Sequence, residues 1–141
     1  ELDLPLVLDI EVDQGDIGKS ALTAAVRTFL DYLKSQDRKV MIYTYYSFYT
    51  NDINVTGYPL WIARYGVNSP GINDWTIWQY TDSGSVKGIN GKVDVNKAVD
   101  SFLYGLTEEP PTDPETPDLQ VTGDTAYSVT KDVFLNQIGR A

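Results

Sequence analysis

The alternation of apolar and polar positions predicts a strand followed by a helix at the start of the chain. Residues 5–10, PLVLDI, form a short apolar run, which is typical of a strand buried on both faces in a parallel sheet. After the turn-like DQGDIG, apolar residues recur at helical spacing through SALTAAVRTFLDYLKSQ, so we expect a helix over residues 20–36. Ser20 is of the residue type that favours the N-cap position of such a helix.

The pattern then changes to strands with little helix between them. Strands are expected over residues 39–45, 59–65 and 76–81, and residues 50–55 indicate either a short helix or a loop. Glycines punctuate SGSVKGINGKVDVN, which predicts a hairpin, and NKAVDSFLYGL predicts a closing helix or helical turn. This order of elements favours an α/β fold, either a parallel sheet or an irregular barrel.

The composition changes sharply near Leu106, where we place a domain boundary. Residues 1–106 hold the patterned elements, and EEPPTDPETPD then brings four prolines and five acids in eleven residues. Such a composition predicts an extended, solvated linker over residues 107–120. Residues 121–141 begin a second patterned segment, which includes TAYSVTKDVFLNQIGRA.

The composition also excludes several classes of function. The 141 residues include 20 acids and 11 bases, a formal net charge of −9, which repels nucleic acid and anionic membranes. No apolar run approaches the roughly 20 residues that span a bilayer. The chain has no histidine or cysteine, which excludes Ser-His-Asp and Cys-His catalysis and removes the usual zinc ligands. Proton transfer must fall to Asp, Glu, Lys or Tyr, and no cofactor is expected.

Acidic residues occupy alternate positions at the end of the first predicted strand. Residues two apart on a strand point the same way, so Asp9 and Glu11 should emerge on one face at the carboxyl end, where parallel α/β folds meet ligands. Two carboxylates that share a cleft raise one pKa, which lets that group donate a proton near neutrality. The alternative is a solvated acidic turn. We reject a calcium loop, because its glycine is misplaced and Ser20 stands at its twelfth position.

Aromatic residues cluster at or near the ends of the predicted strands. Rings with a polar tip suit sugars, whose C–H faces stack on the ring while their hydroxyls form hydrogen bonds. The alternative for each ring is burial in the core. The candidates for sugar binding are Tyr43, Tyr45, Trp61, Trp78 and Tyr80.

Two charged residues are further candidates for the same cleft. Arg64 lies in the otherwise apolar sequence WIARY, and because an unpaired buried guanidinium is costly, we expect it to pair with a carboxylate. Such a pair either stabilises the fold or orients an active-site acid. Asp94 follows the glycine hairpin, where it either reaches the cleft or has a structural role in a turn.

Several of these motifs, taken together and in order, resemble the later two-thirds of a family 25 glycoside hydrolase, a Chalaropsis-type lysozyme or N-acetylmuramidase that also occurs as phage endolysins. They are PLVLDIEVD, IYTYYSFY, PLWIARYG and DWTIWQYTDSGSVKGINGKVDVN, and the resemblance covers residues 3–104. It implies an irregular TIM-like β/α barrel, of which only the later strands and helices are present here. It also implies cleavage of the β-1,4 bond between N-acetylmuramic acid and N-acetylglucosamine in peptidoglycan, by a secreted, wall-associated or phage lysis protein.

By position, the resemblance implies Glu11 as the general acid/base and Asp9 as the residue that orients the substrate's N-acetamido group. Asp94 matches the family's late active-site Asp, whereas Asp13 has no counterpart. The sugar's own amide would act as nucleophile, which predicts retention of configuration. Two alternatives are a peptidoglycan- or carbohydrate-binding protein without turnover and a chitinase-like hydrolase, the latter disfavoured because apolar residues stand where that family has further acids.

The resemblance also contains a departure. The family's opening strand carries an early Asp in a D-x-S motif, and nothing before Glu1 supplies it. We therefore expect an N-terminally truncated fragment that is inactive or nearly so, with an unpaired edge on the strand at 5–10. Residues 121–141 resemble the start of a LysM peptidoglycan-binding repeat without its usual Gly-Asp-Thr turn. Such a module would raise the effective concentration of the hydrolase at the cell wall.

Overall fold

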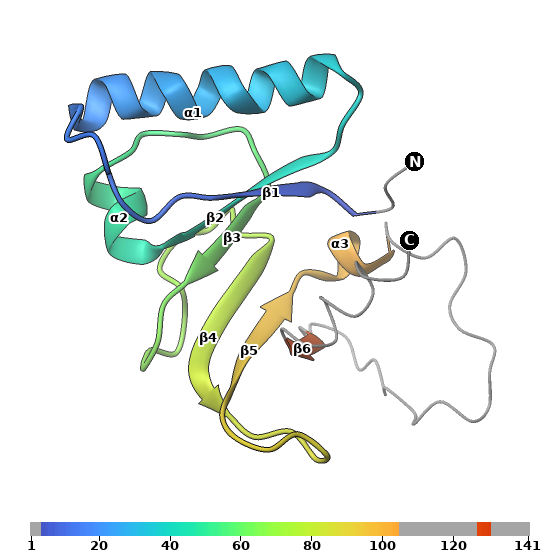
Figure 1. Cartoon of the computed structure of the whole chain (residues 1–141). Coiled ribbons are helices and arrows are strands. Elements are labelled where there is room, and N and C mark those ends of the chain that lie inside the picture. The colour runs from blue at the N-terminus through green and yellow to red at the C-terminus, as the bar shows by residue number, and fades with distance from the viewer. Residues whose placement is uncertain (1–3, 105–126, 131–141) are drawn as a thin grey trace.

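The structure of the protein, a computed structural model, describes residues 4–104 and 127–130. One long helix lies along one side of a sheet of strands, and two short helices accompany it (Figure 1). In chain order the elements are β1 (Leu6–Asp9), α1 (Gly18–Ser35), β2 (Val40–Tyr45), α2 (Tyr46–Asn51), β3 (Leu60–Ala63), β4 (Ile77–Gly84), β5 (Val93–Ala98), α3 (Asp100–Tyr104) and β6 (Tyr127–Thr130).

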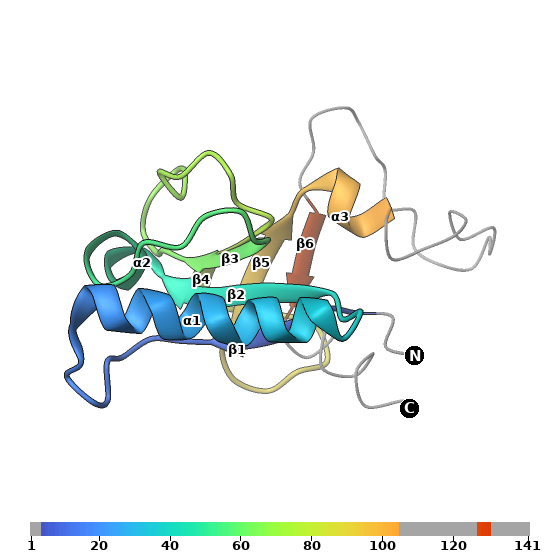
Figure 2. The same cartoon turned by 90° about the horizontal axis from the view of Figure 1, so that it is seen from above.

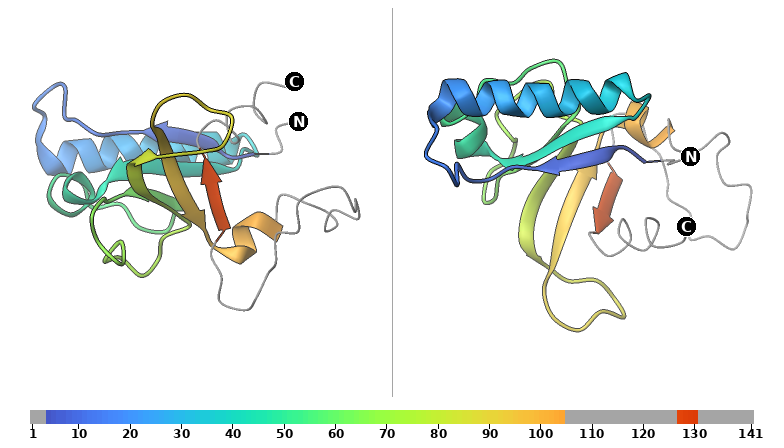
Figure 3. Two further views of the ribbon diagram at one scale, coloured as in Figure 1. Left: turned by 90° about the horizontal axis from the view of Figure 1, so that it is seen from below. Right: turned by 45° about the horizontal axis from the view of Figure 1, so that its top comes forward.

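The six strands form one sheet in sequence order, from β1 to β6. β1 to β4 run parallel to one another, whereas β5 is antiparallel to both β4 and β6. Figure 3 shows that the sheet twists strongly, so that β4 and β5 run across the direction of β1. In the described part of the chain, β1 and β6 are the two edges of an open sheet. The predicted α/β class is confirmed, and the assignment of these strands to the later part of an irregular barrel stays a prediction.

Helix α1 covers one face of the sheet, along β1 and β2 (Figure 2). Its predicted apolar stripe is buried through Leu22, Val26 and Leu30, which belong to the same core as Val40 and Ile42 of β2. Complete burial of one Val or Leu side chain contributes roughly 1.5–3 kcal/mol. The apolar stripe therefore fixes which side of α1 faces the sheet. The other face of the sheet is not covered by this helix.

The start of α1 differs from the prediction. The helix begins at Gly18, so Ser20 lies inside its first turn and the predicted N-cap is wrong. Instead, Oδ2 of Asp13 accepts a 2.8 Å hydrogen bond from the backbone N–H of Gly18. The first N–H groups of a helix lack internal partners, and a carboxylate also suits the positive end of the helix dipole. Asp13, which the resemblance left without a role, thus has a structural one.

Two helices lie at other positions than the sequence pattern suggests. The segment expected as a helix or loop over 50–55 is helical only at residues 50 and 51, where α2 ends. α2 itself starts directly after β2, and the buried ring of Phe48 anchors it to the core. In the predicted closing helix or helical turn over 96–106, the residues up to Ala98 belong to β5, and Asp100–Tyr104 form α3. Ala98 is buried with Met41 and Ile77 on the sheet face away from α1, which keeps this segment in the sheet.

The predicted linker, residues 107–120, lies outside the described residues, as does most of the segment 121–141. The described part of that segment is β6, which pairs with β5 from Val95↔Thr130 to Ala98↔Tyr127. The expectation of a LysM-like module stays a prediction. Across the described ranges, no helix combines the length and apolar character that a bilayer crossing requires.

Candidate active site

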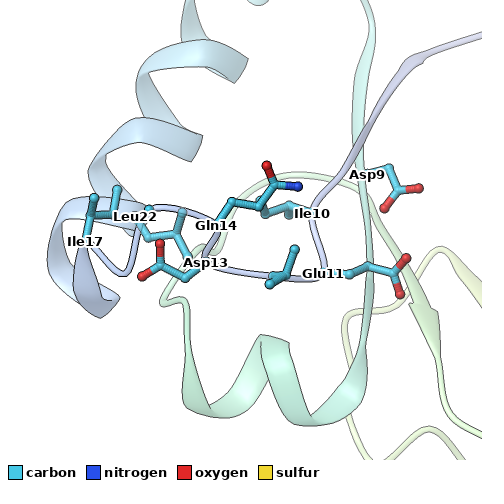
Figure 4. A pocket seen from close by; sticks show the side chains of 9 residues that line it. Asp9, Ile10, Glu11, Asp13, Gln14, Ile17 and Leu22 are labelled. Carbon is cyan, nitrogen blue, oxygen red and sulfur yellow. The ribbon is translucent and has the colours of Figure 1, made fainter.

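Asp9 and Glu11 lie together at the carboxyl end of β1. Asp9 is the last residue of the strand, Glu11 follows it in the β1–α1 loop, and both side chains are exposed. Figure 4 shows their carboxyl groups extending to the same side of the loop, away from Asp13. Both residues also line a hollow of about 530 Å³ beside this loop. The two carboxyl groups are thus open to a ligand on one side, as the alternation along the strand predicts.

The three predicted acids all lie near Tyr43 of β2. The strand register pairs it directly with Asp9. Burial raises the pKa of the Tyr43 phenol well above its ordinary value, and Tyr65, Glu11, Asp9 and Asp94 raise it further. Negative charges act in this way because they disfavour a nearby phenolate. The structure therefore brings the three predicted acids, from β1, its following loop and β5, within electrostatic reach of one phenol.

A second phenol, Tyr65, belongs to the same cluster and follows β3. Burial raises its pKa, and the charges of Asp94, Asp82 and Glu11 raise it further, while a hydrogen bond with Tyr43 lowers it. The side chain is nevertheless 44% exposed, so its ring is open to solvent. Tyr65 thus connects the acid of β5 with the acid that follows β1.

Trp61 of β3 continues the aromatic surface beside Tyr43. The two rings meet edge to face, with centroids 5.1 Å apart and planes at 75°. The indole Nε1 of Trp61 donates a 2.8 Å hydrogen bond to Oδ1 of Asn96. Asp9, Tyr43 and Trp61 occupy one row across three strands. Two of the predicted sugar-binding residues therefore lie next to the predicted acids.

The structure does not bring Trp78 and Tyr80 to this cluster. Trp78 is 4% exposed and belongs to the core between the sheet and α1, and Tyr80 packs against that core. Successive strand residues face opposite sides of a sheet, so it is Gln79, between them, that faces the site. Both rings match the alternative of burial against the core. Tyr45 remains 38% exposed at the end of β2 and contacts the ring of Phe48.

Arg64 has other partners than the expected carboxylate. Its guanidinium lies over the ring of Tyr46, 3.6 Å from the centroid, and Nη1 donates a 2.9 Å hydrogen bond to the carbonyl of Pro70. Gly71 has a φ of +74°, which favours a glycine, and a Cβ there would also displace Nη1. Within the described residues, the predicted ion pair of Arg64 is therefore wrong. A cation–π contact and a backbone carbonyl compensate the half-buried charge instead.

Comparison with known proteins places this geometry in a family. Residues 1–89 match the sequence model described as Glycosyl hydrolases family 25. The chain belongs to this family. The matched residues of this family 25 chain include Asp9, Glu11, Tyr43 and Trp61, whereas Asp94 lies beyond them.

Relatives and solved structures agree with the family 25 assignment. The autolytic lysozyme of Clostridium acetobutylicum is 40% identical over 109 residues, which cover 75% of this chain and 33% of that protein. The catalytic domain of an endolysin from a Listeria monocytogenes bacteriophage is 31% identical with a TM-score of 0.57, over 71% of this chain and 52% of that one. A bacterial lysozyme from Streptomyces coelicolor is 29% identical with a TM-score of 0.52, over 71% and 53%. The chain thus spans a third to about half of the length of these family 25 relatives.

Two residues of this cluster were not selected from the sequence: Gln79 and Asn96. Gln79 and Asn96 are each 3% exposed and face each other in the register of β4 and β5. Oε1 of Gln79 accepts hydrogen bonds from the phenols of both Tyr43 and Tyr65. The available signal was an amide side chain within an otherwise aromatic or apolar strand, as in IWQY and VDVN. In the described part of the chain, no group of three acids lies close enough to hold a metal ion.

Proposed function

We propose that this site serves the hydrolysis of the β-1,4 bond between N-acetylmuramic acid and N-acetylglucosamine in bacterial peptidoglycan. The observation that carries the proposal is the placement of Asp9 and Glu11, which point to the same side of the β1–α1 loop, beside Tyr43. Membership of family 25 and a relative named as an autolytic lysozyme support it.

In the proposed mechanism, Glu11 is the general acid. Its carboxyl group donates a proton to the glycosidic oxygen while the bond from that oxygen to the anomeric carbon breaks. Glu11 suits this role because its exposed side chain lies on the same side of the β1–α1 loop as Asp9, where a substrate is able to reach it. The carboxylate that remains then takes a proton from the incoming water.

Asp9 assists the substrate's N-acetamido group. The acetamido oxygen attacks the anomeric carbon from the face opposite to the leaving group, and the positive charge that develops on the amide is stabilised by the Asp9 carboxylate. Water then opens this cyclic intermediate on the original face, so the configuration is retained. Asp94 adds negative charge from β5 to the same site. Release of a first product with inverted configuration would contradict the substrate-assisted route.

The aromatic residues provide the surface on which a sugar ring lies. Tyr43 and Trp61 are half-buried and share one row of the strand register with Asp9, and Tyr45 and Tyr65 are more exposed. Such rings stack on the C–H faces of a pyranose, while phenol oxygens take part in hydrogen bonds. The proposed partner is therefore a glycan strand of peptidoglycan, and the protein acts where the cell wall is accessible.

A single substitution separates hydrolysis from binding without turnover. In the complete product of the gene, Glu11→Gln should lower cell-wall lysis by about 10²–10⁴-fold, the usual contribution of general acid–base catalysis, while binding to isolated walls persists. Asp16→Asn, which removes an exposed acid of the same loop, is the matched control and should keep full lysis. A wild-type protein that binds walls but releases no reducing ends would support the alternative, a carbohydrate-binding protein. The expected inactivity of the 141-residue chain stays a prediction that the same assay tests.

A further inference from the structure

The hairpin between β4 and β5 contains the dipeptide Asn90-Gly91. Asn90 is the one asparagine in the sequence that precedes a glycine. Both residues are exposed, and neither belongs to a helix or strand. Gly91 has a φ of +102°, and a Cβ placed on it would meet no atom within 4 Å apart from those of its own neighbours in the chain. The dipeptide therefore lies in an open turn.

Hydrogen bonds do not restrain this dipeptide. Within the described ranges, neither the side-chain amide of Asn90 nor the backbone N–H of Gly91 has a hydrogen-bond partner. Asn54 provides a contrast, because its backbone N–H donates a 3.0 Å hydrogen bond to Oγ1 of Thr23 and the next residue, Val55, is buried. The side chain of Asn90 is thus able to turn toward the nitrogen of the residue that follows it.

These two groups are able to form a cyclic imide, a succinimide. The backbone nitrogen of Gly91 attacks Cγ of Asn90, and the bond from Cγ to the side-chain nitrogen breaks. The proton of the Gly91 nitrogen leaves with that group as ammonia. Water then opens the imide at Cγ, which gives aspartate, or at the backbone carbonyl, which gives isoaspartate. Glycine favours the attack because it has no Cβ beside the attacking nitrogen.

The hairpin lies at the end of the sheet that carries the candidate site. Strand β4 is parallel to β1 and enters the hairpin at its carboxyl end, Gly84, and the chain returns into β5 at Val93 (Figure 1). Asp94 is the next residue of β5. A change in the hairpin therefore affects the segment that positions this acid.

We propose that Asn90-Gly91 is a site of spontaneous modification, at which Asn90 passes through a succinimide to isoaspartate and aspartate with water as the only co-reactant. Both products add a carboxylate to the hairpin. Isoaspartate also adds one backbone carbon to the connection that leads into β5. The inference is independent of the proposed hydrolytic function.

The first test follows the modification in the 141-residue chain. The chain is incubated in mildly alkaline buffer made with water labelled with heavy oxygen, and trypsin then releases residues 88–92 for mass spectrometry. Label should enter Asn90 about tenfold faster than Asn68, which is also exposed but precedes a serine. The labelled peptide should separate into aspartyl and isoaspartyl forms. Aspartate without isoaspartate would indicate direct hydrolysis of the amide and overturn the inference, as would equal rates at the two asparagines.

Two variants and a denaturant examine the role of the turn. Asn90→Gln should form no isoaspartate, because its longer side chain closes a ring less readily. Gly91→Ala finds space for its methyl group and should slow the reaction about tenfold, since a Cβ then lies beside the nucleophile. In urea, wild-type Asn90 should react at a rate similar to that in the folded chain. A folded chain that reacts more than about tenfold more slowly would show that the turn protects Asn90, which contradicts the inference.

The effect on β5 is measured by hydrogen exchange. Asn90→Asp reproduces the new carboxylate without the additional backbone carbon, so it is the matched control for the purified isoaspartyl form. The backbone amides of Val93 and Asp94 should exchange faster in the isoaspartyl form than in Asn90→Asp, because the longer connection holds the start of the strand less firmly. Equal exchange in the two proteins would refute the effect on β5.

Discussion

The indole Nε1 of Trp61 donates a 2.8 Å hydrogen bond to Oδ1 of Asn96, which links β3 to β5 across β4. Asn96 is 3% exposed, so its amide has left water and needs partners within the protein. The ring of Trp61 meets Tyr43 edge to face in turn. The orientation of the aromatic surface beside Asp9 thus depends on an amide from the antiparallel part of the sheet.

Substitution of this amide should weaken both the fold and the site. Asn96→Leu has a similar size but leaves the Trp61 N–H without its acceptor, so we expect a loss of about 1–3 kcal/mol in the free energy of unfolding. Urea titration followed by tryptophan fluorescence measures this loss. Asn90→Leu, in the exposed hairpin before β5, is the matched control. Equal unfolding midpoints for the two variants would show that the hydrogen bond does not stabilise the fold.

The capping bond of Asp13 makes a separate prediction for helix α1. Asp13→Ala removes the acceptor of the Gly18 N–H and should lower the free energy of unfolding by about 0.5–2 kcal/mol. Asp13→Asn keeps a side-chain oxygen and should lose much less. Gln14→Ala changes the exposed neighbouring residue and should have little effect. The idea fails if the Asn and Ala variants are equally destabilised in thermal unfolding.

The raised pKa of Tyr43 predicts how stability changes in alkaline solution. The folded-state value lies above the ordinary value of about 10, so the unfolded chain loses this proton first. The stability that the group contributes is complete below about pH 10 and is lost as pH rises through the folded-state pKa. Urea unfolding across this range should show stability falling with pH, and Tyr43→Phe should reduce the slope. Tyr32→Phe, at a position 62% exposed, is the control, and an identical slope in both variants would contradict the prediction.

Part of the site followed from local sequence alone. The apolar run before Asp9 predicts a strand, and a strand that ends at this point carries Asp9 and Glu11 toward the same side, as Figure 4 shows. Strand alternation also predicts that Trp78 and Tyr80 share a face, and their rings are in contact. Alternation cannot tell which of the two faces is the site, however, and these two rings lie against the core under α1.

The N-cap of α1 and the partner of Arg64 show a second reason why the sequence did not predict every contact. Ser20 satisfies the residue preference for an N-cap. The cap is instead Asp13, which lies in the β1–α1 loop and accepts a hydrogen bond from the first N–H group of α1. Arg64 needed compensation for its charge, as predicted, yet the loop that contains Gly71 supplies a carbonyl and α2 supplies a ring. The sequence indicates which kind of interaction a side chain or helix end requires. The tertiary fold determines which residue provides it.

The sequence by itself was therefore enough to predict the α/β class, most strands and the pair Asp9 and Glu11. The evidence was the alternation of side chains, the turn residues and the position of the acids. These three features depend on backbone geometry over only a few residues. The contact between Tyr43, Tyr65 and Gln79 could not be predicted in this way. Their side chains meet only after β2, β3 and β4 have aligned in one register. Register is set by burial on both faces of the whole sheet, and no short stretch of sequence contains that information.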